Sequence, residues 1–141
     1  MAMSLSITHI YAQEQMKIAI MDLNAGVGVS TDDVGGLSDI LINYMFNTGK
    51  YNIVERLQLN QVLKEQGFQA STISAPQIVK IGEVLGVKYI LIGTVNNVLG
   101  DYNIDVRIIS AESGEVVSTA GVTKGKDDTF EEQIKKRIRE L

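Results

Sequence analysis

Residues 51–67, YNIVERLQLNQVLKEQG, change from a strand pattern to a helix pattern with no glycine or proline between the two. The first residues alternate as a short strand does, through Tyr51 and Ile53. Apolar residues then return at helical spacing, and Gly67 closes the helix. The charged pair Glu55-Arg56 lies at the joint. A strand that turns directly into a helix predicts an α/β unit.

The segments around this unit extend it to the order β-α-β-α-α-β-β-β-α. Residues 17–23 and 87–95 are apolar almost throughout, as in strands that are covered on both faces. Residues 103–109 alternate apolar and polar side chains, which indicates one wet face. Short joints at 99–101 and 112–115 predict hairpin turns. We expect a single compact domain with a mixed sheet of about five strands, a C-terminal antiparallel meander and helices mainly on one side.

The other helices are predicted from their first turns and apolar faces. Ser30 with Asp33, and Ser74 with Gln77, have the spacing of capping boxes. Gly82 lies on the apolar face of the helix after Ser74 and would let it approach the sheet closely. A last helix after residue 128 has an acidic first turn and a basic end, which favours the helix dipole.

Composition restricts the function. The 141 residues fit one domain, and a net charge of −4 argues against a nucleic-acid platform. The chain has no cysteine, so it has no disulfide and no thiol chemistry. Its one histidine, His9, lies in a segment that reads differently from the domain. We therefore expect no enzyme activity, no catalytic residue, no cofactor and no metal site.

Residues 1–15, MAMSLSITHIYAQEQ, read either as the remnant of a secretory signal or as a disordered leader. The stretch is moderately apolar and has a small residue, Ala12, where a signal peptidase would cleave. The basic start of a signal is missing. We favour export, and we place the domain at residues 16–141.

A glycine-rich loop at residues 25–31, AGVGVST, follows a strand and opens a helix. A dinucleotide fingerprint would need a third glycine where this loop has Thr31. Only one β-α-β unit precedes the meander, so the crevice of that fold is missing too. We favour a flexible loop before a helix cap, and keep a small-molecule or nucleotide site in this loop as the alternative function.

Asp22, Glu55 and Arg56 are the charged residues placed where strands end. Paired carboxylates can carry out acid–base chemistry. Ion-pair networks of this kind are more often structural. We expect Asp22 to hold the following loop and the Glu55-Arg56 pair to fix the strand-to-helix turn.

Four blocks of the chain, in order, resemble the family of curli production assembly/transport components (CsgG-like). They are VER (54–56), VLKEQ (62–66), LGVKYILIG (85–93) and SGE (113–115), and the resemblance runs from about residue 17 to residue 122. It implies a non-enzymatic envelope protein of bacteria, and it marks Glu65 and Gln66 beside Asp22, Glu55 and Arg56 as candidate interaction or structural residues. Related folds are those of LpoB-like activators, which bind penicillin-binding proteins, and of the TolB N-terminal domain.

Two departures from the family pattern modify this expectation. Its lipoproteins carry a lipidated cysteine, which this chain lacks. Its channel-formers insert long membrane-spanning hairpins, whereas a spanning strand of about nine to eleven residues does not fit the short joints here. We expect a periplasmic or outer-membrane-associated interaction module with peripheral membrane contact at most. Its expected partners are other envelope proteins and copies of itself, with no nucleic acid.

Overall fold

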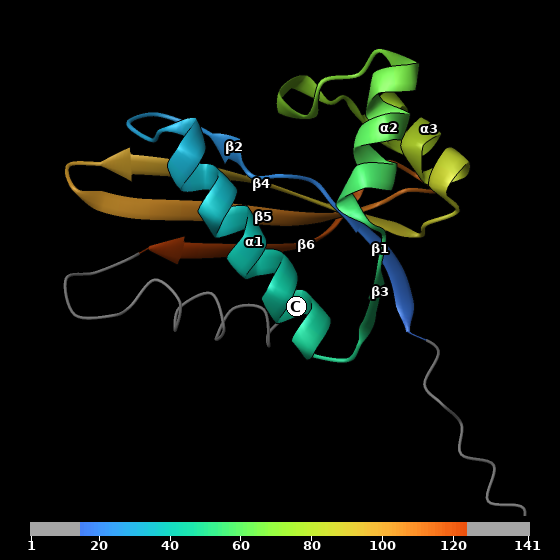
Figure 1. Cartoon of the computed structure of the whole chain (residues 1–141), viewed down its shortest axis with the longest axis horizontal. Coiled ribbons are helices and arrows are strands. Elements are labelled where there is room, and N and C mark those ends of the chain that lie inside the picture. The colour runs from blue at the N-terminus through green and yellow to red at the C-terminus, as the bar shows by residue number, and fades with distance from the viewer. Residues whose placement is uncertain (1–14, 124–141) are drawn as a thin grey trace, which may run out of the picture.

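The computed structural model describes residues 15–123, which form one α/β domain around a mixed six-stranded sheet (Figure 1). The strands are β1 (Met16–Ile20), β2 (Asn24–Ala25), β3 (Tyr51–Ile53), β4 (Tyr89–Val98), β5 (Asp101–Ser110) and β6 (Val116–Thr123). The helices are α1 (Thr31–Asn47), α2 (Arg56–Gln66), α3 (Ala75–Leu85) and a 3₁₀ turn, Ala70–Thr72. The predicted α/β class is confirmed.

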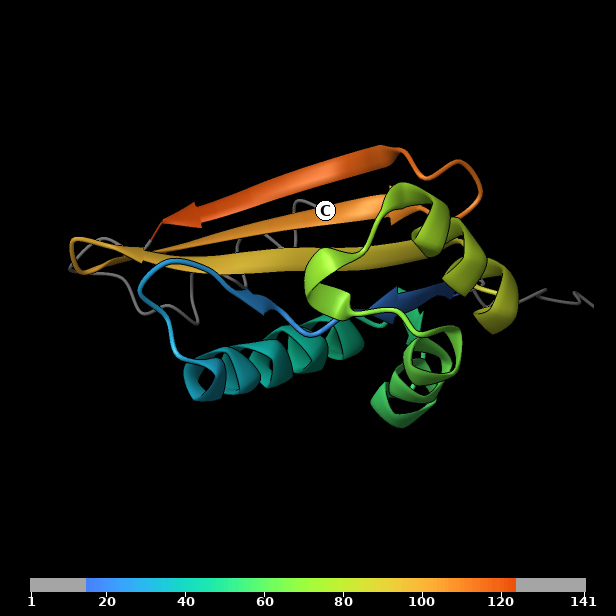
Figure 2. The same ribbon diagram turned by 90° about the horizontal axis from the view of Figure 1, so that it is seen from above.

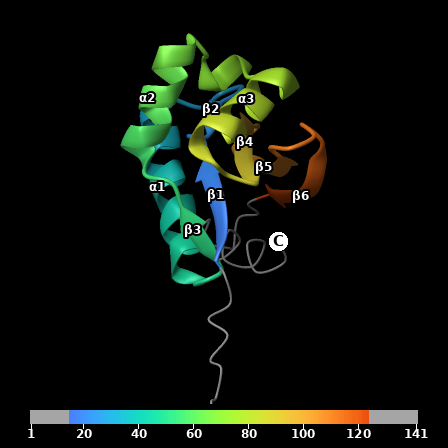
Figure 3. The same cartoon turned by 90° about the vertical axis from the view of Figure 1, so that its right-hand side faces the viewer.

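The sheet has the strand order β3-β1-β4-β5-β6, and β2 pairs with β4. β1 runs parallel to β3 and to β4, whereas β4, β5 and β6 are antiparallel, so the predicted meander is confirmed. β3 and β6 form the two edges among the described strands, as Figure 3 shows. Because β1 and β3 are parallel neighbours, the segments that follow them leave the sheet at the same end.

Both faces of β1 are covered by helices. Ile18 and Ile20 pack with α1 in one core, and the alternate residues Ala19 and Met21 pack with α2 and α3 in a second. Successive side chains of a strand point to opposite faces, so α1 lies on one face and the other two helices lie on the opposite one. Figure 2 shows α1 running along one side of the sheet. Two of the three described helices, α2 and α3, therefore share one face, in line with the expectation of helices mainly on one side, and α1 covers the other face.

Local capping explains where the helices begin and end. Ser30 Oγ accepts a hydrogen bond from the Asp33 amide (3.2 Å), and Ser74 and Gln77 form a reciprocal capping box. α2 ends at Gly67, which has a φ of +69°. A Cβ at Gly82 would overlap the Ala111 side chain, so the predicted close approach of α3 to the sheet is confirmed.

The structure differs from the sequence-based expectation in its first strand. β1 ends at Ile20, and the chain then leaves β1 and pairs with the distal part of β4 as the short strand β2. Met21 and Leu23, in the segment between β1 and β2, are buried, which is why the whole stretch has the pattern of one apolar strand. The leader up to residue 14 and the predicted last helix lie outside the described residues.

Candidate functional site

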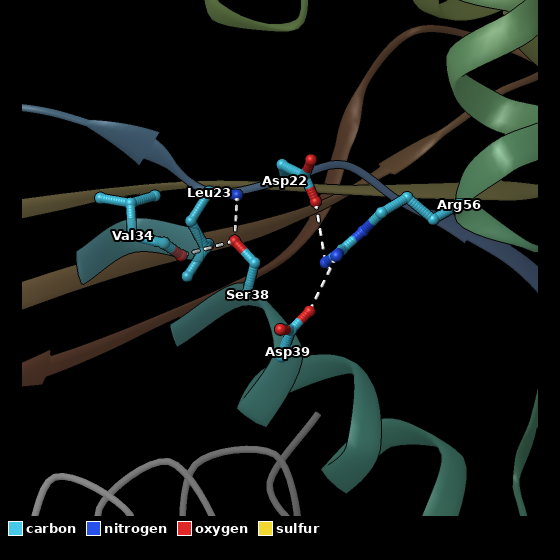
Figure 4. Close-up of polar contacts among 6 residues, drawn as sticks. All are labelled: Asp22, Leu23, Val34, Ser38, Asp39 and Arg56. Atoms are coloured by element: carbon cyan, nitrogen blue, oxygen red, sulfur yellow. Dashed lines mark hydrogen bonds and ion pairs between the residues drawn. The ribbon is translucent and has the colours of Figure 1, made fainter. Parts of the chain in front are cut away.

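Arg56 occupies the joint between β3 and α2, and its side chain reaches toward α1 (Figure 4). Asp22 follows β1, which is the parallel neighbour of β3, so the two residues meet where these strands end. Asp39 comes from the middle of α1. The site therefore joins three elements that are far apart in the sequence.

The guanidinium of Arg56 lies between two carboxylates. Its Nη2 atom is 3.0 Å from Asp22 Oδ1, and its Nη1 atom is 2.8 Å from Asp39 Oδ1. The side chains are 38%, 49% and 62% exposed for Arg56, Asp22 and Asp39. Exposed ion pairs of this kind contribute at most about 1 kcal/mol each, because water and salt screen them. The pairs orient the joint more than they stabilise the fold.

The alignment of the guanidinium is incomplete. Nε and Nη2 are buried atoms and make no well-aligned hydrogen bond within the described part of the chain, although Nη2 is close to Asp22. Short contact without alignment provides charge attraction but only part of the hydrogen-bond energy. The Nη1–Asp39 contact is the shorter of the two.

Ser38 fastens the loop after β1 to α1. Its Oγ accepts a hydrogen bond from the Leu23 amide and donates one to the Val34 carbonyl, both at 2.9 Å. Ser38 is 1% exposed, and its buried hydroxyl has a partner within the domain both as donor and as acceptor. This contact fixes the position of Asp22, the residue before Leu23, relative to α1.

A shallow pocket of about 360 Å³ opens beside the joint and is lined by Asp39, Ile42, Asn43 and Arg56. Two exposed apolar side chains come from the same two helices, close in sequence to the lining residues. Phe46, one helical turn after Ile42, is 68% exposed, and Leu57, directly after Arg56, is 81% exposed. Arginine and aromatic residues are enriched in the energetically dominant parts of protein interfaces. An open, partly apolar surface of this kind suits contact with a protein more than enclosure of a small ligand.

The other predicted residues take different places. Glu55 is the N-cap of α2 and is exposed, but its side chain makes no cap hydrogen bond, so it does not hold the turn as we expected. Glu65 and Gln66 lie at the far end of α2, about 15 Å along the helix from Arg56. Glu65 accepts a hydrogen bond from Gln61 Nε2 at 3.2 Å. Only Asp22 and Arg56 of the predicted set meet in one place.

Asp39 and Ser38 were not predicted from the sequence. Ser38 lies on the same face of α1 as the buried residues Val34, Leu41 and Met45. A small polar residue inside an apolar stripe is a signal that could have been used. Asp39 gives no such signal, because its partner Arg56 comes from a separate element.

The glycine-rich loop packs against β4. The Gly26 amide donates to the Val95 carbonyl (2.7 Å), and the Val27 amide donates to Asn96 Oδ1 (2.9 Å). A phosphate site would need such amides to be free. The first turn of α1 also carries Asp32 and Asp33, which would repel an anion. The geometry gives this loop a packing role.

Over residues 15–123, no three His, Cys, Asp or Glu side chains come together as a metal site. None of the helices in that range has the length and apolar character needed to cross a bilayer.

The fold and the joint define a class of protein: a small open-sheet α/β domain whose polar site is an ion-paired connection between helices on opposite faces. The family model described as curli production assembly/transport component CsgG matches residues 3–98. This match covers more than half of the 141 residues, so the chain belongs to the CsgG family and the predicted resemblance is confirmed. No curated protein matches the chain.

Several solved structures share the fold. The C-terminal domain of LpoB from Escherichia coli is 17% identical, with a TM-score of 0.68 over 79% of this chain and 83% of that one. The PelC dodecamer from Paraburkholderia phytofirmans is 15% identical, with a TM-score of 0.59 over 90% and 88%. TolB from Acinetobacter baumannii is 12% identical, with a TM-score of 0.52 over 86% of this chain but 25% of TolB. At these identities the likeness shows a common fold.

Proposed function

We propose that this domain is a non-enzymatic protein–protein interaction module of the bacterial cell envelope, exported and either periplasmic or associated with the outer membrane. The observation that carries the proposal is the CsgG family match, because that family is described by a role in curli production, assembly and transport. The role proposed here is of the same kind, namely assembly or transport through contacts with other envelope proteins.

Self-association is part of the proposal. PelC, which shares the fold, is described as a dodecamer, and this supports a homo-oligomer for the present chain. The surface we assign to protein contact is the Arg56 joint with its pocket and the two exposed apolar side chains, Phe46 and Leu57. Glu55 and Glu65 extend this surface along the exposed side of α2.

The compartment is tested on the natural protein in the bacterium that produces it. Cells are fractionated into cytoplasm, periplasm and membranes, and an antibody against the domain locates it beside a marker of each fraction. We expect the protein in the periplasmic or outer-membrane fraction. Recovery with the cytoplasmic marker alone would overturn the envelope assignment.

Self-association is tested by sedimentation equilibrium on the whole chain over a wide concentration range. We expect a defined oligomer, which Leu57→Ser weakens because it removes an 81% exposed apolar side chain at the joint. Val84→Ser is the matched control, since Val84 is an exposed residue of α3, a helix that contributes no residue to the ion pairs or the pocket of the joint. A monomer at every concentration would remove the homo-oligomer, and equal effects of the two variants would remove the joint as its interface.

A further inference from the structure

The turn between β4 and β5 holds a leucine in an unfavourable setting. Leu99 is 100% exposed, and its φ of +54° makes it the one non-glycine residue with positive φ in the described chain. Gly100 follows with a φ of +85°, so both residues of this two-residue turn have positive φ, as in a type I′ turn.

A different residue would serve the isolated domain better at this position. Type I′ turns favour Asn-Gly, because asparagine tolerates positive φ and its polar side chain suits solvent. A leucine with positive φ has a strained backbone, and the apolar side chain of Leu99 is fully exposed to solvent. The strain and the exposure together point to a contact that Leu99 makes outside its own domain.

Two more exposed apolar side chains accompany Leu99. Val98 is 51% exposed and Val27 is 74% exposed, and we call these three residues the apolar tip. The Val27 amide donates to Asn96 Oδ1 (2.9 Å), and the Asn97 amide donates to the Val27 carbonyl (2.8 Å). Figures 1 and 2 show the loop before α1 at the same end of the molecule as the hairpin turn. The apolar tip is thus held in place before any partner binds.

Among the residues that the structure describes, the charge at this end of the domain is negative. Asp101 begins β5 directly after the turn, and Asp32 and Asp33 lie in the first turn of α1 at this end of the domain. The first basic residue along β5 is Arg107, about 20 Å from Asp101 along the strand. Lys124 and Lys126, which follow β6, lie outside the described residues.

We propose that the apolar tip inserts into an apolar pocket with a basic rim on a different protein. Three apolar side chains with carboxylates at the same end of the domain complement such a pocket in both surface and charge. An anionic lipid surface would repel the same carboxylates. A second copy would present the pocket at the Arg56 joint, where two carboxylates (Asp22 and Asp39) contact one guanidinium and the exposed Glu55 is the next residue along the chain, so like charges would meet. The proposal rests on the geometry of the tip and not on the compartment.

The test places a photo-crosslinking amino acid at position 98 of the full chain, in cells of the bacterium that produces it. Position 113, an exposed serine in the turn between β5 and β6, carries the same amino acid in the control chain. We expect one protein adduct from position 98 that position 113 does not give. The crosslinked peptide of the partner, identified by mass spectrometry, should combine apolar residues with lysine or arginine.

Leu99→Asn separates binding from folding. Because asparagine relieves the backbone strain, we expect the melting temperature to rise by about 3 °C. Binding to the purified partner should weaken at least about tenfold, as for loss of an interface anchor. Val117→Asn, at an exposed position of β6, is the control and should leave the affinity unchanged.

Every other outcome overturns the proposal. An adduct with the mass of two copies would assign the tip to self-association, and a lipid adduct would assign it to a membrane. Equal adducts at positions 98 and 113, or none at either, would remove the tip as a docking surface. A lower melting temperature for Leu99→Asn, with binding intact, would show that Leu99 serves the fold.

Discussion

Arg56 Nη1 lies 2.8 Å from Asp39 Oδ1, although the two residues belong to helices on opposite faces of the sheet. The two side chains meet beyond the ends of the parallel strands β1 and β3, where Asp22 provides the second carboxylate. Each hydrophobic core is held by its own helices, and this polar joint is a direct connection between the two layers. The proposed interface is built on that connection.

Arg56→Ala should lower the free energy of unfolding by about 1 kcal/mol, measured by urea denaturation. Two ion pairs are lost, but each contributes little to the free energy of unfolding because all three side chains are partly exposed to water. The loss should shrink at 1 M salt, where screening weakens the remaining attraction in the parent protein.

Asp39→Asn is the matched variant, because it removes one carboxylate and keeps the shape of the side chain. In a double-mutant cycle with Arg56→Ala, the two losses should be less than additive, since both remove the same contact. Additive losses would mean that the Arg56–Asp39 contact is not formed in solution.

Ser38→Ala should cost more stability than Arg56→Ala, about 1 to 3 kcal/mol. The substitution leaves the buried Leu23 amide without the acceptor that lies 2.9 Å away, and an unsatisfied buried donor costs more than an exposed ion pair. Ser71→Ala, at an exposed serine in the 3₁₀ turn, should change the free energy of unfolding by less than about 0.5 kcal/mol. Equal effects would contradict a specific role of Ser38.

Gly82→Ala and Gly35→Ala should have opposite signs. A Cβ at Gly82 overlaps Ala111, so alanine there pushes α3 from the sheet and lowers the melting temperature. A Cβ at Gly35, inside α1, meets nothing within 4 Å, so alanine there raises stability by up to about 1 kcal/mol through helix propensity. Ala111→Gly should partly rescue Gly82→Ala. Stabilisation by Gly82→Ala would mean that α3 sits farther from the sheet.

Local patterns predicted most of the elements. β4 is a long apolar run and β5 alternates, so each strand carries its own signal. The capping residues Ser30 and Ser74 directly precede the first residues of α1 and α3, and each capping pattern spans only four residues. β2 has two residues and exists only because it pairs with Thr94 and Val95, which no local pattern can indicate. Its absence from the prediction follows from that dependence on tertiary contact.

The arrangement of the helices was only partly predicted. Ile18, Ala19, Ile20 and Met21 are all apolar, and this run already implied that both faces of β1 are covered. Nothing in it says which helix takes which face. Two of the three ion-paired residues of the joint, Asp22 and Arg56, were predicted because both follow strands. Asp39 depends on the rotation of α1 about its axis, which is set by packing.

Tyr51 should make stability depend on alkaline pH. The side chain is 7% exposed, and burial raises its pKa above the ordinary value of 10.0. The unfolded chain then ionises first as the pH rises, so the contribution of Tyr51 is complete below about pH 10 and is lost as the pH climbs through the folded pKa. The loss is at most about 1.4 kcal/mol per pH unit.

Tyr51→Phe lacks this group, so the difference in free energy of unfolding between the parent protein and the variant should stay constant from pH 7 to pH 9. It should then change in favour of the variant up to pH 11. A difference that is the same at pH 9 and pH 11 would show that the Tyr51 hydroxyl is solvated in the folded protein.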